Sequence, residues 1–341
     1  MLTCKSPRKV LLVAYHAARL VLPHQSCKFS RHDFTWPQLF ACLVLREHQK
    51  KSYRGLEALL LDTDWCRIIG LRRVPDHNTL CRAFHAIMNH LRFERMMDLV
   101  TRIVHTCRAL GIDSTYFDTH HHSRHYEHRC RQHASKDPQT ANARRALATK
   151  MLPKLALAVD VATHLILAAR TQMGMSGDAH DFAPLLRQAC RRVKKVLAAL
   201  ADPGFDSHAN HVVAREELGV VSLIKANAGR PTAKVATSQY RQAMKQELVG
   251  SQAGKPYGQR AQVETVNSMI KRNLGDCLRA RSEKARSMEQ LLRVLTHNVM
   301  ILRRTQRVET EPDAAIFISV RPLRPRHRTP AGSPCRPARP S

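Results

Sequence analysis

The spacing of the apolar residues changes at Gly111, and this change divides the chain into two kinds of structure. Before it, residues 36–108 carry apolar side chains every three to four positions, which is typical of helices with one buried face. One helix is expected to begin at Asp76 or Asn78, either of which can serve as its N-cap. Its expected apolar face consists of Leu80, Phe84, Ile87, Met88 and Leu91. A second helix, stopping near Gly111, is expected to carry Phe93, Met96, Met97, Val100, Ile103, Val104 and Cys107.

From Gly111 onward, strand-like segments rich in β-branched and aromatic residues are mixed with helix-like segments. Strands are predicted at residues 111–117, 155–161, 165–169, 196–201 and 220–224. Helices are predicted from near His180, around 212–218, and over 257–274 and 286–304. The second and third strands are expected to form a hairpin through residues 162–164. A hairpin group followed by strands that alternate with helices is typical of a mixed sheet covered on its faces.

The charge balance indicates a polyanionic partner. The chain has 56 Lys and Arg against 27 Asp and Glu, a formal net charge of +29, which is too large for the solvated face of one helix. A membrane surface would require an amphipathic anchor or a spanning segment, and no uninterrupted run of about 18 apolar residues is present. Nucleic acid is therefore the expected partner. Charged residues and histidines interrupt the apolar stretch of residues 1–22, so this stretch is not expected to be a signal peptide. We therefore expect a cytoplasmic protein.

The C-terminal end has a different composition from the rest. Residues 319–341 contain six Arg, six Pro and no acidic residue. Such a segment cannot bury enough apolar surface to offset its chain entropy, so we expect it to be disordered. The sequence thus predicts a helical N-terminal domain over 1–108, a mixed α/β domain over 109–310 and a disordered basic tail over 311–341.

The helix expected over residues 257–274 carries an ordered row of polar side chains. At 100° per residue, Tyr257, Arg260, Glu264 and Lys271 fall within a stripe about 60° wide, opposite an apolar face. Tyr257 and Lys271 would lie about 10 Å on either side of Glu264. The four side chains cannot share one metal ion. They match successive phosphates of a nucleic-acid backbone, with one carboxylate in the middle able to bind a cation, although an ordinary amphipathic surface helix would show the same stripe.

The spacing Y-x2-R-x3-E-x6-K of these four residues resembles the signature of a large group of insertion-sequence transposases with a DDE catalytic triad. Residues 111–115 and 201–206 resemble the segments that bear the first two family carboxylates, and the similarity extends over residues 36–305. The resemblance implies an α/β fold of the ribonuclease-H-like type: a mixed five-stranded sheet flanked by helices and preceded by an all-helical N-terminal domain. It implies that Asp113 lies on the first strand, Asp202 just past the fourth and Glu264 on a late helix.

The resemblance also implies a chemistry. Asp113, Asp202 and Glu264 would be both the catalytic residues and the metal ligands, holding two Mg²⁺ ions per active site, with Mn²⁺ able to substitute. Two hard cations about 3.5 to 4 Å apart neutralise charge on both the attacking and the leaving oxygen of a phosphodiester. DNA contacts are implied for the other three signature residues, Tyr257, Arg260 and Lys271.

The implied function is a DNA transposase that cleaves the inverted-repeat ends of an insertion sequence and joins them to target DNA. Its partners would be those two DNAs and a second copy of the chain, bound as a homodimer on DNA. Two alternatives stay open: a ribonuclease-H-like nuclease that cuts without joining, and a domesticated DNA-binding protein that has lost catalysis.

Other charged and polar residues of the sequence are expected to lie outside the catalytic site. Turn, loop or capping roles are expected for Asp118, Asp160, Asp178 and Asp206. The His-rich segment 119–133 is interpreted as a solvated basic loop beside DNA, since its ligand spacing fits no standard zinc pattern. The basic run over 187–195 is interpreted as a phosphate contact, with a solvated helix end as the alternative. No base-reading residue is assigned in the helical first third, where Tyr53, Arg54 and Arg82 were considered.

Overall fold

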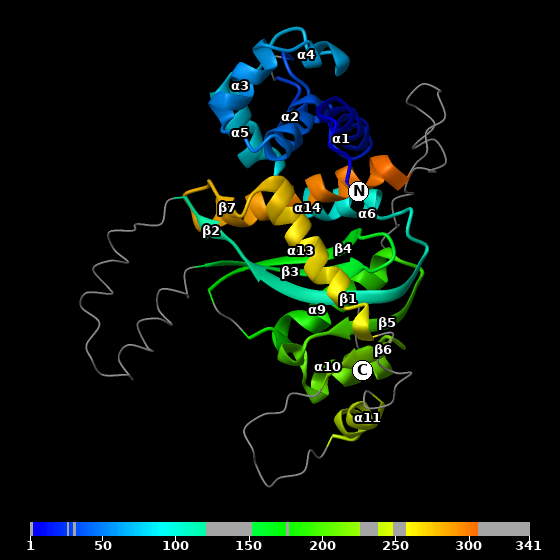
Figure 1. Cartoon of the computed structure of the whole chain (residues 1–341). Coiled ribbons are helices and arrows are strands. Elements are labelled where there is room, and N and C mark those ends of the chain that lie inside the picture. Colours follow the sequence, from blue (N-terminus) through cyan, green and yellow to red (C-terminus); the bar gives the residue numbers. More distant parts are fainter. Residues whose placement is uncertain are drawn as a thin grey trace, which may run out of the picture. The chain divides into compact units, whose positions relative to one another are not determined.

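The computed structural model describes residues 3–25, 27–29, 32–120, 152–174, 177–225, 238–247 and 257–305 (Figure 1). All of these belong to one compact unit, Met1–Gln306. The Pro/Arg-rich tail and most of the His-rich segment lie outside the described residues, so the expectations for both stay predictions. None of the described helices is long and apolar enough to cross a membrane.

The first third of the described chain is helical, as predicted. Its helices are α1 (Pro7–Val21), α2 (Trp36–His48), α3 (Tyr53–Leu61), α4 (Trp65–Ile68), α5 (His77–Ile87) and α6 (His90–Val100). The side chain of Asp76 accepts a hydrogen bond from the backbone N–H of Thr79, so Asp76 rather than Asn78 is the N-cap of α5. Helix α1 was not predicted, although a serine followed by a proline starts it in the usual way.

Two predicted helix boundaries were wrong. Met88 takes an extended backbone after α5, and Leu91 lies in α6 with 61% of its surface exposed, so neither belongs to the apolar face of α5. Helix α6 ends at Val100 rather than near Gly111, because the residues from Thr106 onward pair with a neighbouring strand. Hydrogen bonds to a distant part of the chain thus override the local helical spacing.

The second part of the chain forms a five-stranded mixed sheet. Its strands are β1 (Thr106–Tyr116), β3 (Pro153–Asp160), β4 (Ile166–Met173), β5 (Lys195–Ala201) and β6 (Val221–Ile224), in the order β4-β3-β1-β5-β6. Strands β1, β3 and β4 pair antiparallel, and the predicted hairpin joins β3 to β4. Strands β5 and β6 continue the sheet in parallel with β1. A two-stranded sheet pairs β2 (Asp118–Thr119) with β7 (Cys277–Leu278).

Helices cover both faces of the five-stranded sheet, which is the expected layering. The remaining elements are α9 (Ala179–Arg192), η1 (Pro203–Phe205), α10 (His208–Val212), η2 (Val213–Glu217), α11 (Gln239–Glu247), α13 (Ala261–Leu274) and α14 (Glu283–Thr305). Helix α9 packs on the face to which Leu110 and Ile112 belong, in an apolar core shared with Phe182 and Leu185. Helix α13 crosses the opposite face of β1 (Figure 1).

Gly111 explains how closely α13 approaches the central strand. A Cβ atom added at Gly111 would lie 2.0 Å from Cγ2 of Val263, which is far inside van der Waals contact. Only glycine allows this approach. Because side chains alternate along a strand, Asp113 lies on the same face as Gly111 and is therefore held next to α13.

A buried ionic network joins α2 to α14. The Arg293 guanidinium donates to Glu47 at 3.1 Å and to Glu289 at 2.9 Å, and Arg46 also pairs with Glu47. Arg293 further donates to the carbonyl oxygens of Gly275 and Cys277, beside β7. Charges this deeply buried are tolerated only when they are paired and hydrogen-bonded, so the network fixes how α2, α14 and the end of β7 pack together.

Candidate active site

The central strands place two of the candidate carboxylates side by side. In the parallel pairing of β1 and β5, Ile112 is opposite Ala201. Asp113 and Asp202 each follow directly, Asp113 within β1 and Asp202 where β5 gives way to the turn η1. The side chain of Asp113 is partly buried under α13, whereas that of Asp202 is 40% exposed. The carboxyl end of β5 is thus one wall of the candidate site.

Arg260 links the second and third carboxylates. It lies just before the first residue of α13, and its guanidinium contacts Asp202 Oδ1 at 2.6 Å and Glu264 Oε1 at 2.9 Å. Glu264, in the first turn of α13, is 55% exposed on its side chain. The structure therefore brings Asp113, Asp202 and Glu264 to one place, from β1, β5 and α13.

The helix beneath this row begins later than predicted. Helix α13 starts at Ala261, and a turn with hydrogen bonds from Arg260 N to Tyr257 O and from Val263 N to Arg260 O precedes it. The single helix assumed from residue 257 was therefore wrong, and Gly258 is a helix-destabilising residue at this point. The predicted row of side chains is nevertheless kept, because the turn places Tyr257 and Arg260 at the same edge of the site.

Tyr257 and Lys271 lie at opposite ends of the row. The Tyr257 hydroxyl donates to the carbonyl oxygen of Ala201 at 3.3 Å, at the end of β5. Lys271 Nζ lies 5.6 Å from the ring centre of Phe117, just past β1, and forms no ion pair with a described residue. One end of the row is thus tied to the sheet, and the other end carries an available positive charge.

Asn267 is a site residue that the sequence analysis did not single out. Its side-chain amide donates to Asp113 Oδ2 at 3.0 Å, and the residue is 7% exposed. A signal was present in the sequence: at 100° per residue, Asn267 falls about 60° from Glu264, at the edge of the polar stripe. Asparagine is also unusual at a buried position of a helix that packs against a sheet.

The pKa of Asp113 reflects its burial and its acidic neighbours. Burial is the main cause that raises this pKa to about 6, helped by the charges of Asp202 and Glu264 and opposed by the Ser114 N–H and Arg260. Carboxylates that are brought together and partly removed from water favour a cation or a proton. A bound cation would relieve the same repulsion.

The donor set suits a hard divalent cation, because all three side chains offer carboxylate oxygens. In the described part of the chain, however, no three His, Cys, Asp or Glu side chains converge on a single ion position. The guanidinium of Arg260 occupies the space between Asp202 and Glu264 and neutralises them. The three carboxylates are therefore suitable ligands for divalent metal ions. To bind an ion, however, at least one of them has to lose its contact with Arg260.

The other aspartates have structural partners. Asp160 accepts hydrogen bonds from the N–H and hydroxyl of Thr163 in the β3–β4 turn, which confirms the turn role. Asp206 accepts hydrogen bonds of 2.6 to 3.0 Å from the Arg241 guanidinium. Asp118 begins the short strand β2 instead of lying in a loop.

Asp178 lies at the start of α9 but makes no side-chain capping hydrogen bond, so its predicted capping role was wrong. Its carboxylate instead contacts Lys154 Nζ at 2.7 Å and accepts from Ser114 Oγ at 2.6 Å. Lys154 is fully buried and also contacts Asp181. This buried lysine needs both acids, which accounts for Asp178 without a catalytic role.

The basic run over residues 187–195 is partly used inside the molecule. Arg187 pairs with Glu217 at 2.6 Å, and Arg192, 3% exposed on its side chain, pairs with Glu94 and Asp98 of α6. For Arg192 the predicted phosphate contact was wrong, since its guanidinium is buried and paired within the fold, whereas for Arg187, 46% exposed on its side chain, the phosphate contact stays a prediction.

The five-stranded mixed sheet with helices on both faces and carboxylates at its centre defines a ribonuclease-H-like protein. Residues 108–300 match the protein-family model described as "Transposase DDE domain". That match covers more than half of the chain, and the chain belongs to the DDE transposase family. No curated protein matches the sequence.

Proposed function

We propose that this transposase cleaves the inverted-repeat ends of an insertion sequence and joins them to target DNA, with Asp113, Asp202 and Glu264 as its catalytic carboxylates. The observation that supports the assignment is the pair of contacts from Arg260, 2.6 Å to Asp202 and 2.9 Å to Glu264. Together with the hydrogen bond from Asn267 to Asp113, these contacts gather three acids from distant parts of the chain. The Arg260 guanidinium is shared by Asp202 and Glu264, and Asp113, which the Asn267 amide holds, is the third acid of the group.

The carboxylates would hold two divalent cations, Mg²⁺ with Mn²⁺ able to substitute. When bound, such ions neutralise charge on the attacking and leaving oxygens of the phosphodiester. Asp113, Asp202 and Glu264 would be the residues that hold them. The chain's own contribution is to fix these oxygens: α13 covers Asp113, and Asn267 holds one of its two oxygens in place.

The reaction needs no nucleophile from the protein. In the first step, the oxygen of water attacks phosphorus at the end of the element and the bond to the 3′ oxygen breaks, leaving a 3′ hydroxyl. In the second step, that hydroxyl attacks a target phosphodiester, and the target's own 3′ oxygen leaves. The carboxylate cluster serves both steps, because each forms one P–O bond and breaks another at a phosphodiester.

The other three residues of the row would position the DNA. We assign phosphate contacts to Tyr257, Arg260 and Lys271, since a row of this length matches several successive phosphates. Arg260 would turn from the carboxylates to the scissile phosphate as cations take its place, because a planar guanidinium can bind phosphate through two hydrogen bonds. Residues 1–108 would recognise the inverted repeats, residues 109–310 would be the catalytic domain, and two copies would pair the two ends.

The test is a strand-transfer assay with the purified full chain, labelled inverted-repeat ends, a target plasmid and Mg²⁺. Joined product supports the proposal. Cleaved ends without joined product would identify a nuclease, and bound but uncut ends would identify a DNA-binding protein without catalysis. Glu264→Gln is the matched control, since it keeps the shape of the side chain and removes its charge.

A further inference from the structure

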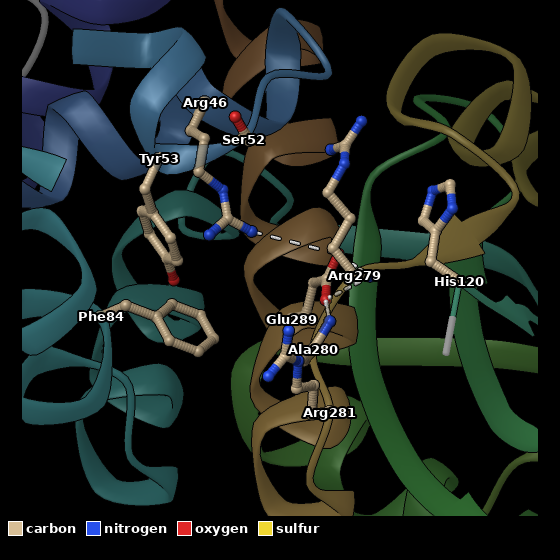
Figure 2. A pocket seen from close by; sticks show the side chains of 9 residues that line it. All are labelled: Arg46, Ser52, Tyr53, Phe84, His120, Arg279, Ala280, Arg281 and Glu289. Carbon is tan, nitrogen blue, oxygen red and sulfur yellow. Dashed lines mark hydrogen bonds and ion pairs between the residues drawn. The ribbon is translucent and has the colours of Figure 1, made fainter. Parts of the chain in front are cut away.

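A second feature of the molecule lies away from the carboxylates: a cavity of about 430 Å³. Three parts of the chain enclose it, namely α2, α3 and α5, the residue after β2, and the segment from β7 into α14 (Figure 2). Its lining consists of Arg46, Ser52, Tyr53, Phe84, His120, Arg279, Ala280, Arg281 and Glu289. Its size lies within the range of pockets that bind small organic groups, about 300 to 1,000 Å³.

One wall of the cavity is aromatic. The rings of Tyr53 and Phe84 are 6.4 Å apart between centroids and tilted by 58° to each other, and the Arg46 guanidinium lies 4.2 Å from the ring centre of Tyr53. Phe84 is buried, whereas Tyr53 is half-buried and its hydroxyl has no hydrogen bond to any described residue. Such a wall favours a planar ring as its ligand, with a free hydroxyl to contact the ring's polar edge.

The facing wall is basic. Figure 2 shows Arg279 and His120 across the cavity from Tyr53 and Phe84. Arg279 is held by hydrogen bonds to the carbonyl oxygens of residues 50 and 51. Arg281 is exposed and forms no ion pair with a described residue. This wall therefore presents positive charge to whatever enters.

The single acid of the lining, Glu289, does not cancel that charge. Its carboxylate accepts hydrogen bonds from the backbone N–H groups of Arg279 and Ala280 and from the Arg293 guanidinium. It is 1% exposed and belongs to the buried network between α2 and α14. An aromatic wall opposite a basic wall suits a ligand that carries a planar ring at one end and an anionic group at the other.

We propose that this cavity receives one unpaired nucleotide of the bound DNA, its base against Tyr53 and its phosphate against Arg279 and Arg281. The inference rests on the proposed function. The cavity lies close enough to the carboxylates for one DNA molecule to reach both. His120 follows Asp113 by seven residues, so the two residues lie at most about 25 Å apart. A nucleotide within about seven base pairs of the cleaved phosphate would reach the cavity.

The experiment uses the full chain in metal-free buffer, so that DNA is bound and not cut. A blunt duplex is compared with the same duplex carrying a short single-stranded extension that contains 2-aminopurine. The wild type is expected to bind the extended duplex more tightly than the blunt one and to quench the fluorescence of the modified base. Tyr53→Ala should lower this preference by roughly five- to a hundredfold, the range measured for loss of one base stack, and abolish the quenching.

Three variants make the test specific. Tyr53→Phe keeps the ring and should keep the quenching. Arg54→Ala removes a neighbouring exposed charge that does not line the cavity, and should leave the preference unchanged. Arg281→Ala alters no buried group, and should lower the salt slope by about 0.7 for the extended duplex only.

The possible failures are distinguishable. If Tyr53→Ala and Arg281→Ala keep the full preference and the quenching while blunt-duplex affinity equals that of the wild type, the cavity is not a nucleotide site and the proposed function stands. If the wild type binds neither duplex, the proposed function fails and the cavity assignment fails with it. If a free nucleoside monophosphate binds in a Tyr53-dependent way but the extension does not, the site takes a free nucleotide and the assignment to DNA is overturned.

Discussion

The side-chain amide of Asn267 donates a hydrogen bond of 3.0 Å to Asp113, and thereby joins α13 to the central strand of the sheet. Glu264 lies three residues earlier on the same helix. One helix thus carries both a proposed metal ligand and the group that orients another. Any shift of α13 along β1 would change two of the three carboxylates together.

Replacing Asn267 by alanine should weaken metal binding by about ten- to a hundredfold, the usual cost of losing a hydrogen bond to a ligand. The fold should persist, because the change removes only one small polar group. Metal affinity measured by calorimetry is the readout. Ser268→Ala, an exposed neighbour on the same helix, is the matched control. Unchanged metal affinity in Asn267→Ala would show that the amide does not position Asp113.

Neutral replacements of the three carboxylates should abolish cleavage while leaving inverted-repeat binding nearly intact. Asp113→Asn, Asp202→Asn and Glu264→Gln each keep the side-chain shape but lose the charge that holds a hard cation. Cleavage of labelled ends and a gel shift on the same DNA measure the two properties separately. A variant with full cleavage would remove its residue from the triad.

DNA binding should weaken by orders of magnitude between dilute and moderate salt if about six or more phosphates are neutralised. Lys271→Ala should lower the salt slope by about one unit and leave metal affinity unchanged, since Lys271 contacts the Phe117 ring rather than a carboxylate. Arg260→Lys should not keep full activity, because an ammonium group cannot contact two groups in one plane. Loss of metal binding in Lys271→Ala with normal DNA binding would contradict the proposed row.

Gly111→Ala should destabilise the protein by about 1–3 kcal/mol or more, because its Cβ atom would overlap Val263. The free energy of unfolding from a denaturant titration measures the effect. Gly177→Ala is the control, since a Cβ atom there meets nothing within 4 Å. Adding Val263→Ala to Gly111→Ala should recover part of the loss, and no recovery would mean that the strain arises elsewhere.

His297 should make stability depend on pH. It is fully buried, its Nε2 lies 3.1 Å from the carbonyl oxygen of His164, and burial lowers its pKa from 6.5 to about 4. Between these two values the unfolded chain binds a proton that the folded chain does not, so its contribution to stability is present above pH 6.5 and is lost as the pH falls, by about 1.4 kcal/mol per unit. His297→Gln can keep the hydrogen bond without titrating, and its unfolding free energy should fall less steeply between pH 6.5 and 4. Equal slopes for both proteins would remove His297 as the cause.

Much of the fold could be predicted, because the strands carry strong local signals. The hairpin of β3 and β4 and the runs of β5 and β6 were found within one or a few residues of their ends. The first residues of β1 were missed, since their strand conformation depends on pairing with β5, far away in the sequence. The turn before α13 was also missed, because the periodicity of the sequence predicts a helix there.

The candidate site shows the same division. Spacing and resemblance predicted Asp113, Asp202 and Glu264 as site residues, and the fold brings these three together. They could not identify Arg260 as a bridge between two carboxylates, nor Asn267 as a donor to the third, because such contacts depend on side-chain directions set by packing. The internal pairing of Arg187 and Arg192 was missed for the same reason.

The buried pairing of Arg293 with Glu47 has a consequence for how such proteins can diverge by recombination. An exchange that brought in a foreign N-terminal segment without a carboxylate at the position of Glu47 would leave the guanidinium of α14 partly unmatched in the core, at a cost of about 3–5 kcal/mol. An exchange of the helical segment that we propose to recognise DNA ends would therefore have to carry α2 and α14 together, although these helices lie near opposite ends of the described chain. Gradual substitution on the exposed faces of α3 and α5 is the route that leaves this pairing intact.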